Sequence, residues 1–127
     1  MITPDVDLMA VLRKSFPDAK VGVGVGMTKM AAKTVITLTS TALPIGFKAR
    51  GGKWVVDCTV LDTDRSDAFL TAGAAFDELT RAIDAGEVGD ATGWTTVTLP
   101  TSVDQNTGSQ KHSAVSFALQ VTGHYGL

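Results

Sequence analysis

The residues of this chain that could cradle an anion lie in one glycine-rich run. Glycine and valine alternate through residues 21–26, and a threonine and a lysine follow. A phosphate-binding loop places four residues between its glycines, and a dinucleotide loop follows a strand and opens a helix. The run fits neither pattern, because its period of two is that of a strand. It predicts a strand with Gly22, Gly24 and Gly26 on one face, where another backbone or subunit can approach closely.

A second group that could do chemistry is the set of aspartates Asp62, Asp64 and Asp67. Their spacing resembles that of a calcium loop, but the central glycine and the closing glutamate of such a loop are missing. The same residues lie where helix caps and first-turn acids belong. We therefore expect a helix capped by Ser66, with Asp67 in its first turn, in place of a calcium site.

The remaining candidates for catalysis are isolated. His112 and His124 have no His or Cys partner at metal-ligand spacing, and Cys58 lies inside an apolar run typical of a core strand. No serine stands in a Gly-x-Ser-x-Gly turn. We expect no catalytic residue, no bound metal and no cofactor, and hence a protein that is not an enzyme.

The composition indicates a globular chain with more apolar surface than one small domain needs. The 127 residues are 44% hydrophobic and 19% charged, with a net charge of −2. This length predicts a single domain over residues 1–127. A mean hydropathy of +0.18 points to apolar surface that is buried at a subunit interface. The chain has one cysteine and no apolar run of membrane-spanning length or signal-peptide pattern, so we expect no disulfide, no membrane association and a reducing cytoplasm.

The small net charge hides two blocks of opposite sign. Six Lys or Arg and no acid lie between Asp18 and Asp57, whereas nine acids and two arginines lie in residues 57–90. Either block could be a solvated face. The sharper hypothesis is head-to-tail association, in which the basic block of one subunit meets the acidic helix of the next. A third possibility is that Lys20 to Lys53 contact nucleic acid. The interface hypothesis includes Lys48, Arg50 and Lys53 on the basic side and Asp77, Glu78 and Asp84 on the acidic side.

Periodicity and breakers predict two helices and five strands. The first helix begins at Thr3 and Pro4 and ends before Pro17, and the second carries an apolar stripe and ends at Gly86. Pro100 is expected to end the fourth strand. The fold class is α+β in the order α-β-β-β-α-β-β, with a mainly antiparallel sheet and helices packed on one face. The strands are expected at residues 21–26, 34–39, 53–61, 94–99 and 112–123, and the stripe comprises Phe69, Ala72, Phe76, Leu79 and Ile83.

This order of elements resembles that of the tail terminator and tail-completion proteins of long-tailed bacteriophages. A strand through Val60, Leu61 and Asp62 leads directly into the amphipathic helix, and a long last strand follows a polar loop. The resemblance covers nearly the whole chain as a pattern. These families share no short motif, so no functional residue can be transferred singly.

The resemblance implies a structural virion protein with no catalytic role. It would form a hexameric ring that caps the tail tube, stops tail polymerisation and presents the joining surface to the head connector protein. DNA would pass through the lumen without sequence recognition, and the protein would be assembled in the host bacterial cytoplasm and reside at the tail–head junction. Similar adaptor folds serve as head-completion or tube proteins. The alternative from another class is a small α+β ligand-binding module or enzyme, which would need a deep pocket with convergent polar groups.

Overall fold

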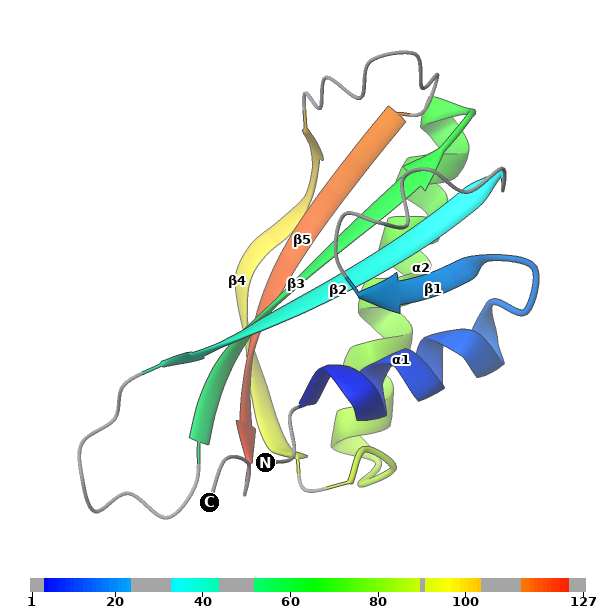
Figure 1. The fold of residues 1–127 in the computed structure, drawn as a ribbon. Coiled ribbons are helices and arrows are strands. Elements are labelled where there is room, and N and C mark those ends of the chain that lie inside the picture. Colours follow the sequence, from blue (N-terminus) through cyan, green and yellow to red (C-terminus); the bar gives the residue numbers. More distant parts are fainter. Residues whose placement is uncertain (1–3, 24–32, 44–51, 90, 104–112, 124–127) are drawn as a thin grey trace.

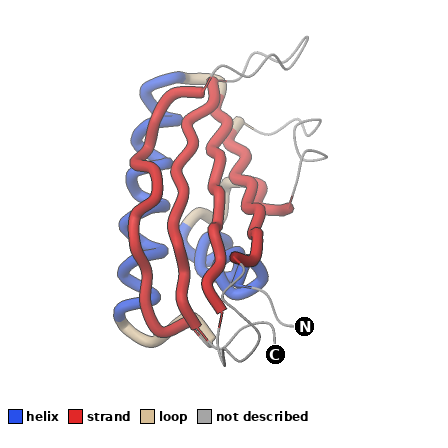
Figure 2. The backbone as a smooth tube through the Cα atoms, turned by 90° about the vertical axis from the view of Figure 1, so that its left-hand side faces the viewer, coloured by secondary structure: helices blue, strands red, loops and turns tan. Residues whose placement is uncertain are grey.

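One five-stranded sheet with two helices on one of its faces makes up the protein (Figure 1, Figure 2). The computed structural model describes residues 4–23, 33–43, 52–89, 91–103 and 113–123. The expected α+β class and the expected order of elements are both confirmed. In chain order the elements are α1 Pro4–Ser15, β1 Lys20–Val23, β2 Thr34–Leu43, β3 Gly52–Asp62, α2 Arg65–Asp84, β4 Ala91–Val103 and β5 Ser113–Gly123.

The strands lie in the order β1-β2-β3-β5-β4. The pairs β2–β3, β3–β5 and β5–β4 are antiparallel, and β1 runs parallel to β2. The sheet is therefore mainly antiparallel, as expected. Strand β5, the last of the strands along the chain, lies between β3 and β4, so β1 and β4 form the two outer edges.

Helix α1 forms where its sequence signals predict it. Pro4 is its first residue, where a missing N–H breaks no helical hydrogen bond. Asp5 and Asp7 lie in the first turn, where the positive end of the helix dipole stabilises their negative charge. Leu8 and Leu12 are fully buried beneath it. The helix packs against β1 and β2.

The N-cap of helix α2 lies two residues before Ser66, the expected cap. Asp64 is the N-cap, and its carboxylate accepts a hydrogen bond of 3.0 Å from the backbone N–H of Asp67. The prediction that Ser66 caps the helix is wrong, because the extended backbone of Asp64 already aims a carboxylate at the orphan N–H groups. Gly86 follows the C-cap with φ +72°, so the glycine expected there is confirmed.

The buried face of α2 is made of small residues. Ala68, Ala72 and Ala75 are fully buried, together with Leu79. They bring the helix backbone close to the sheet, and the larger rings therefore lie on its flank. Phe69 is 38% exposed, so its expected place in the buried stripe is wrong.

The flank of α2 that carries the aromatic rings faces β4 and β5. Phe76 is half-buried, with its ring centroid 5.6 Å from that of Phe117 and 6.0 Å from that of Trp94 in edge-to-face geometry. The indole Nε1 of Trp94 donates a hydrogen bond of 2.9 Å to Asp84. These contacts fix which side of α2 lies beside the β4 edge.

Strands β2, β3 and β4 are longer than expected. Strand β2 reaches Leu43 and β3 begins at Gly52, which shortens the expected loop. Strand β4 continues through Pro100 to Val103, so the prediction that Pro100 ends it is wrong. The missing N–H of Pro100 is tolerated because β4 is an edge strand among the described strands and is bulged at that point.

The main core lies between the sheet and the helices. On β5, the four residues expected to share a face, Val115, Phe117, Leu119 and Val121, are all buried in it. A second, small cluster of Val35, Leu61 and Ala114 forms one cross-strand row on the opposite face.

Candidate functional site

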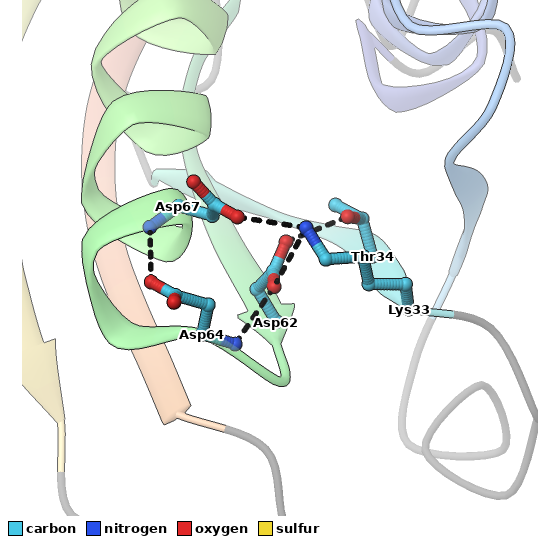
Figure 3. Close-up of polar contacts among 5 residues, drawn as sticks. All are labelled: Lys33, Thr34, Asp62, Asp64 and Asp67. Carbon is cyan, nitrogen blue, oxygen red and sulfur yellow. Dashed lines mark hydrogen bonds and ion pairs between the residues drawn. The ribbon is translucent and has the colours of Figure 1, made fainter.

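The aspartates at the start of α2 form a structural junction between three elements (Figure 3). Asp62 is 1% exposed, and its carboxylate accepts hydrogen bonds from the Thr34 hydroxyl at 2.6 Å and from the Asp64 backbone N–H at 2.9 Å. Lys33 lies between two carboxylates, 3.7 Å from that of Asp62 and 2.7 Å from that of Asp67. The junction therefore ties the start of β2 to the end of β3 and the cap of α2.

This geometry decides between the two interpretations of the acidic cluster. The hydrogen bond that Lys33 donates to Asp67, with the nearby carboxylates, raises the pKa of the lysine above its usual value. The positive charge beside the carboxylates of Asp62 and Asp67 is thus supplied by the Lys33 ammonium group. Among the residues that the structure describes, no group of three or more acids, histidines or cysteines could hold a metal ion. Capping is confirmed.

Cys58 is a core residue, as expected. It is fully buried in β3, and burial raises the pKa of its thiol far above the usual value. The thiolate, which is the nucleophilic form, is therefore disfavoured.

A groove of about 450 Å³ lies between α1 and the C-terminal half of α2. Arg81 lies on its wall and forms ion pairs with Glu78 and Glu87. The hydrogen bond from Arg81 lowers the pKa of Glu78 and keeps it ionised. At the end of the groove Gly89 has φ +27°, and a Cβ there would run into the Asp7 carboxylate. The charged groups on this wall bind one another, which suits a helix–helix contact better than an open ligand site.

The glycine-faced strand and the basic block are described only in part. Gly22 is buried in β1, opposite Thr37 of β2. Lys53 is exposed on β3, on the face of the sheet that the helices leave open. The other members of the hypothesis, Gly24, Gly26, Lys48 and Arg50, lie outside the described residues.

Farther along β3 from Lys53, the same open face of the sheet carries hydroxyl groups that bind within the sheet. The Thr59 hydroxyl lies 3.3 Å from that of Ser116, and the Ser116 hydroxyl donates to the carbonyl of Cys58 at 3.2 Å. The Thr37 hydroxyl contacts the carbonyl of Thr59 at 3.5 Å. These side chains thus stabilise neighbouring strands.

The three acids of the interface hypothesis lie on α2 but on two different sides of it. Glu78 turns toward α1 and Arg81. Asp77 and Asp84 are seven residues apart, which places them on one stripe of the helix, and Asp84 contacts Trp94 of β4. The structure therefore groups Asp77 with Asp84 and separates them from Glu78 and Lys53.

Large apolar side chains are exposed at the two sides of the molecule. The described residues expose five of them, namely Val6, Phe69, Leu70, Val97 and Leu99. Leu70 stands seven residues before Asp77 on the outer surface of α2, roughly opposite its buried alanines, whereas Phe69 stands seven residues before Phe76 and lies on the α2 flank beside β4. Val97 and Leu99 belong to β4 itself.

Val6 lies on the opposite side, beside β1. It shares a stripe of α1 with Arg13, seven residues later, whose guanidinium donates a hydrogen bond of 3.2 Å to the carbonyl of Val21 in β1. Lys20, also exposed, begins the same strand. We call Val6, Arg13 and Lys20, with the exposed Asp18 beside them, the β1 side. The β4 side comprises Phe69, Asp84, Val97 and Leu99, with Leu70 and Asp77 on the adjoining outer surface of α2.

The sequence hypothesis included neither Val97 nor Leu99 in an interface. A signal for them was present, because residues 91–103 contain no charged residue. That run gains its meaning only when β4 is known to be an edge strand, since a central strand would be equally uncharged.

Comparisons with known proteins leave the chain without an assigned family. No family model matches it, and no curated protein matches it either. Neither α1 nor α2, the two helices that the structure describes, is long and apolar enough to span a membrane.

Proposed function

We propose that the protein is a structural subunit that assembles head to tail into a closed ring, and that this ring caps a phage tail tube and joins it to the head connector. The observation that carries the proposal is that the two sides of the sheet are unlike in charge. The β1 side presents Arg13 and Lys20, and the β4 side presents Asp77 and Asp84. Within the described residues, Asp77 and Asp84 form no ion pair.

Unlike sides favour association of one specific geometry. When a surface on one side of a subunit complements a different surface on the other side, every copy binds the next in the same way. If the rotation between neighbours closes, the product is a ring. A two-fold dimer through the β4 side would instead bring the aspartates of both copies together, at an electrostatic cost.

Part of the charge complementarity first inferred from the sequence acts within one chain. Lys33 of the basic block binds Asp62 and Asp67 of the acidic block, and Arg81 neutralises Glu78. The charges that remain for assembly are consequently fewer than the sequence totals suggested. In the proposed ring, the sheet and its junctions are rigid and the sides supply the contacts, so no catalytic group or cofactor is required.

The experiment is to measure the mass of the purified full chain by light scattering over a wide range of protein concentration, and to image it by negative-stain electron microscopy. We expect a discrete assembly, six-fold in the form that the resemblance implies, with a central channel. Addition of duplex DNA of any sequence should leave the mass and the particles unchanged. A chain that remains a monomer at every concentration would contradict the proposal.

A further inference from the structure

We infer that the β4 edge is the apolar half of the subunit contact and that its occupant is the β1 side of a second copy of this chain. This inference rests on the proposed ring and names the surface that builds it. The contact would place Leu99 and Val97 of one copy against Val6 of the next, with Arg13 and Lys20 near Asp77 and Asp84.

The first support is that β4 lacks the protection that an edge strand normally has. Exposed edges of monomeric proteins are usually short or carry charges that prevent pairing with other chains. Strand β4 has 13 residues and no charged residue, and in the described parts of the chain β5 is its only neighbour in the sheet. The other edge is protected, because β1 has 4 residues, begins with Lys20 and has the Arg13 guanidinium on the carbonyl of Val21.

The second support is that irregular pairing with β5 turns two large apolar side chains of β4, Val97 and Leu99, toward solvent. Thr96 lies opposite Leu119 and Thr98 lies opposite Ala118, so Val97 is an extra residue between them. The next shift leaves Leu99 and Pro100 opposite a single residue of β5. Such bulges redirect side chains, and Val97 and Leu99 are 52% and 63% exposed in a strand whose regular alternation would bury one face.

Charge selects a second copy over an unrelated partner. The β4 side carries two exposed carboxylates and four exposed apolar side chains, whereas the β1 side carries two exposed cations and the fifth exposed apolar side chain, Val6. The β1 side also exposes Asp18, which leaves it one net positive charge against the two aspartates of the β4 side, so the two sides of one molecule are opposite in sign. A partner with an acidic surface would meet repulsion at the β4 side.

The first test introduces one charge at the β4 edge. Leu99→Lys should weaken association at least about tenfold, because a lysine cannot be buried against Val6 without a partner. Thr39→Lys is the matched control, since Thr39 is an exposed strand residue on β2 outside the contact, and it should leave association unchanged. Circular dichroism should be unaltered in both variants, and so should thermal melting at protein concentrations at which both are monomeric. Wild-type association of Leu99→Lys would overturn the inference.

The second test distinguishes a head-to-tail contact from a two-fold contact. Val6→Cys and Leu99→Cys are purified separately, and mild oxidation is applied to each alone and to their mixture. The native Cys58 is fully buried and does not interfere. Disulfide-linked pairs should form in the mixture, whereas each variant alone should give none. Efficient pairing of Leu99→Cys with itself would overturn the inference in favour of a two-fold contact.

The two proposals fail in different ways. If the wild-type chain forms a ring that Leu99→Lys does not disturb, the inferred contact is wrong and the ring stands. If the wild-type chain stays monomeric at every concentration and the mixed cysteine variants do not cross-link, both are wrong.

Discussion

At the scale of single residues, the ionisable groups closest to a chemical role are all bound by their neighbours. Asp62 accepts two hydrogen bonds while almost completely buried, and Lys33 completes its surroundings. Cys58 is held as a neutral thiol by its burial. The residues that looked most like a metal or nucleophile site in the sequence therefore have structural roles.

Replacing Asp62 with alanine should lower the free energy of unfolding by about 3 kcal/mol, because the Thr34 hydroxyl and the Asp64 N–H lose a charged acceptor. Asp57→Ala, an exposed carboxylate on the same strand, is the control and should change stability by less than about 0.5 kcal/mol. Urea unfolding of the monomer measures both. Equal losses for the two variants would show that the junction contributes nothing.

Glu78 should make stability depend on acidity. The hydrogen bond from Arg81 lowers its pKa in the folded protein, so the unfolded chain binds the proton more readily. The stabilisation is present above the ordinary pKa of 4.5 and is lost as the pH falls through the lowered value.

The measurement for Glu78 is the melting temperature between neutral and acidic pH. Glu78→Gln should melt at a lower temperature than the wild type at neutral pH and lose less stability on acidification. Arg81→Gln should flatten the acid limb at least as much, because it removes the ion pair with Glu87 as well as that with Glu78, and adding Glu78→Gln to it should change little further. An unchanged acid limb in Glu78→Gln would contradict this assignment.

At the scale of elements, α2 and β4 define the molecule's more unusual side. The alanine face of α2 lets the helix approach the sheet, which displaces Phe76 toward Trp94 and leaves Phe69 half in solvent. The bulges of β4 then turn Val97 and Leu99 outward. Together they leave apolar side chains along one edge of an otherwise well-packed sheet.

Phe76→Ala should destabilise the protein by about 3 kcal/mol, near the lower end for a phenylalanine because the ring is half-buried. The fluorescence of the folded state should also change, since Phe76 contacts Trp94 edge-on. Phe69→Ala, one heptad earlier on the same flank, is the matched control and should cost less, about 1 kcal/mol in the monomer, because its ring is more exposed. A larger loss at Phe69 than at Phe76 would show that the two rings have exchanged roles.

The type and order of the elements could be predicted from the sequence because each has a strong local signal. Pro4 and Pro17 bound α1, Gly86 ends α2, and β5 alternates over its buried face. The errors fall where tertiary context decides. A proline ends a central strand but not a bulged edge strand, and residues 91–103 do not reveal that β4 lies at the edge.

The candidate site was less predictable for a related reason. The sequence gives total charge by segment, but pairing within the chain decides which charges remain at the surface. Lys33 forms an ion pair with Asp67, and Glu78 forms one with Arg81, whereas Asp77 forms none within the described residues. Spacing along α2 placed all these acids on one helix, and only packing against α1 and β4 separated its two sides.

At the scale of the whole molecule, the proposal is a subunit with a rigid centre and two complementary sides. Sheet pairing and the core account for the centre (Figure 1). Electrostatic attraction between exposed groups sets the choice of neighbour and weakens in salt, whereas the apolar contact does not weaken in the same way. Assembly should therefore show both a salt-sensitive and a salt-insensitive component.

Exchanging the charges on the two sides tests the electrostatic part of the contact between subunits. Asp77→Lys and Lys20→Glu should each weaken association about fivefold at low ionic strength. One chain that carries both substitutions should regain the wild-type affinity, because every contact again joins opposite charges. Analytical ultracentrifugation at low and high salt measures the three variants. If the double variant does not regain the wild-type affinity, Asp77 and Lys20 do not lie near each other in the assembly.

The central place of β5 has a consequence for how the subunit is made. Strand β4 has β5 as its sheet neighbour, and β3 pairs with β5 on one side, yet β5 follows both of them in the chain and is synthesised after them. Until then the uncharged β4 has no partner and is prone to aggregate, which makes chaperone protection during synthesis valuable. In the proposed ring, a nascent chain without β5 would lack a finished β4 edge for the neighbouring subunit to bind.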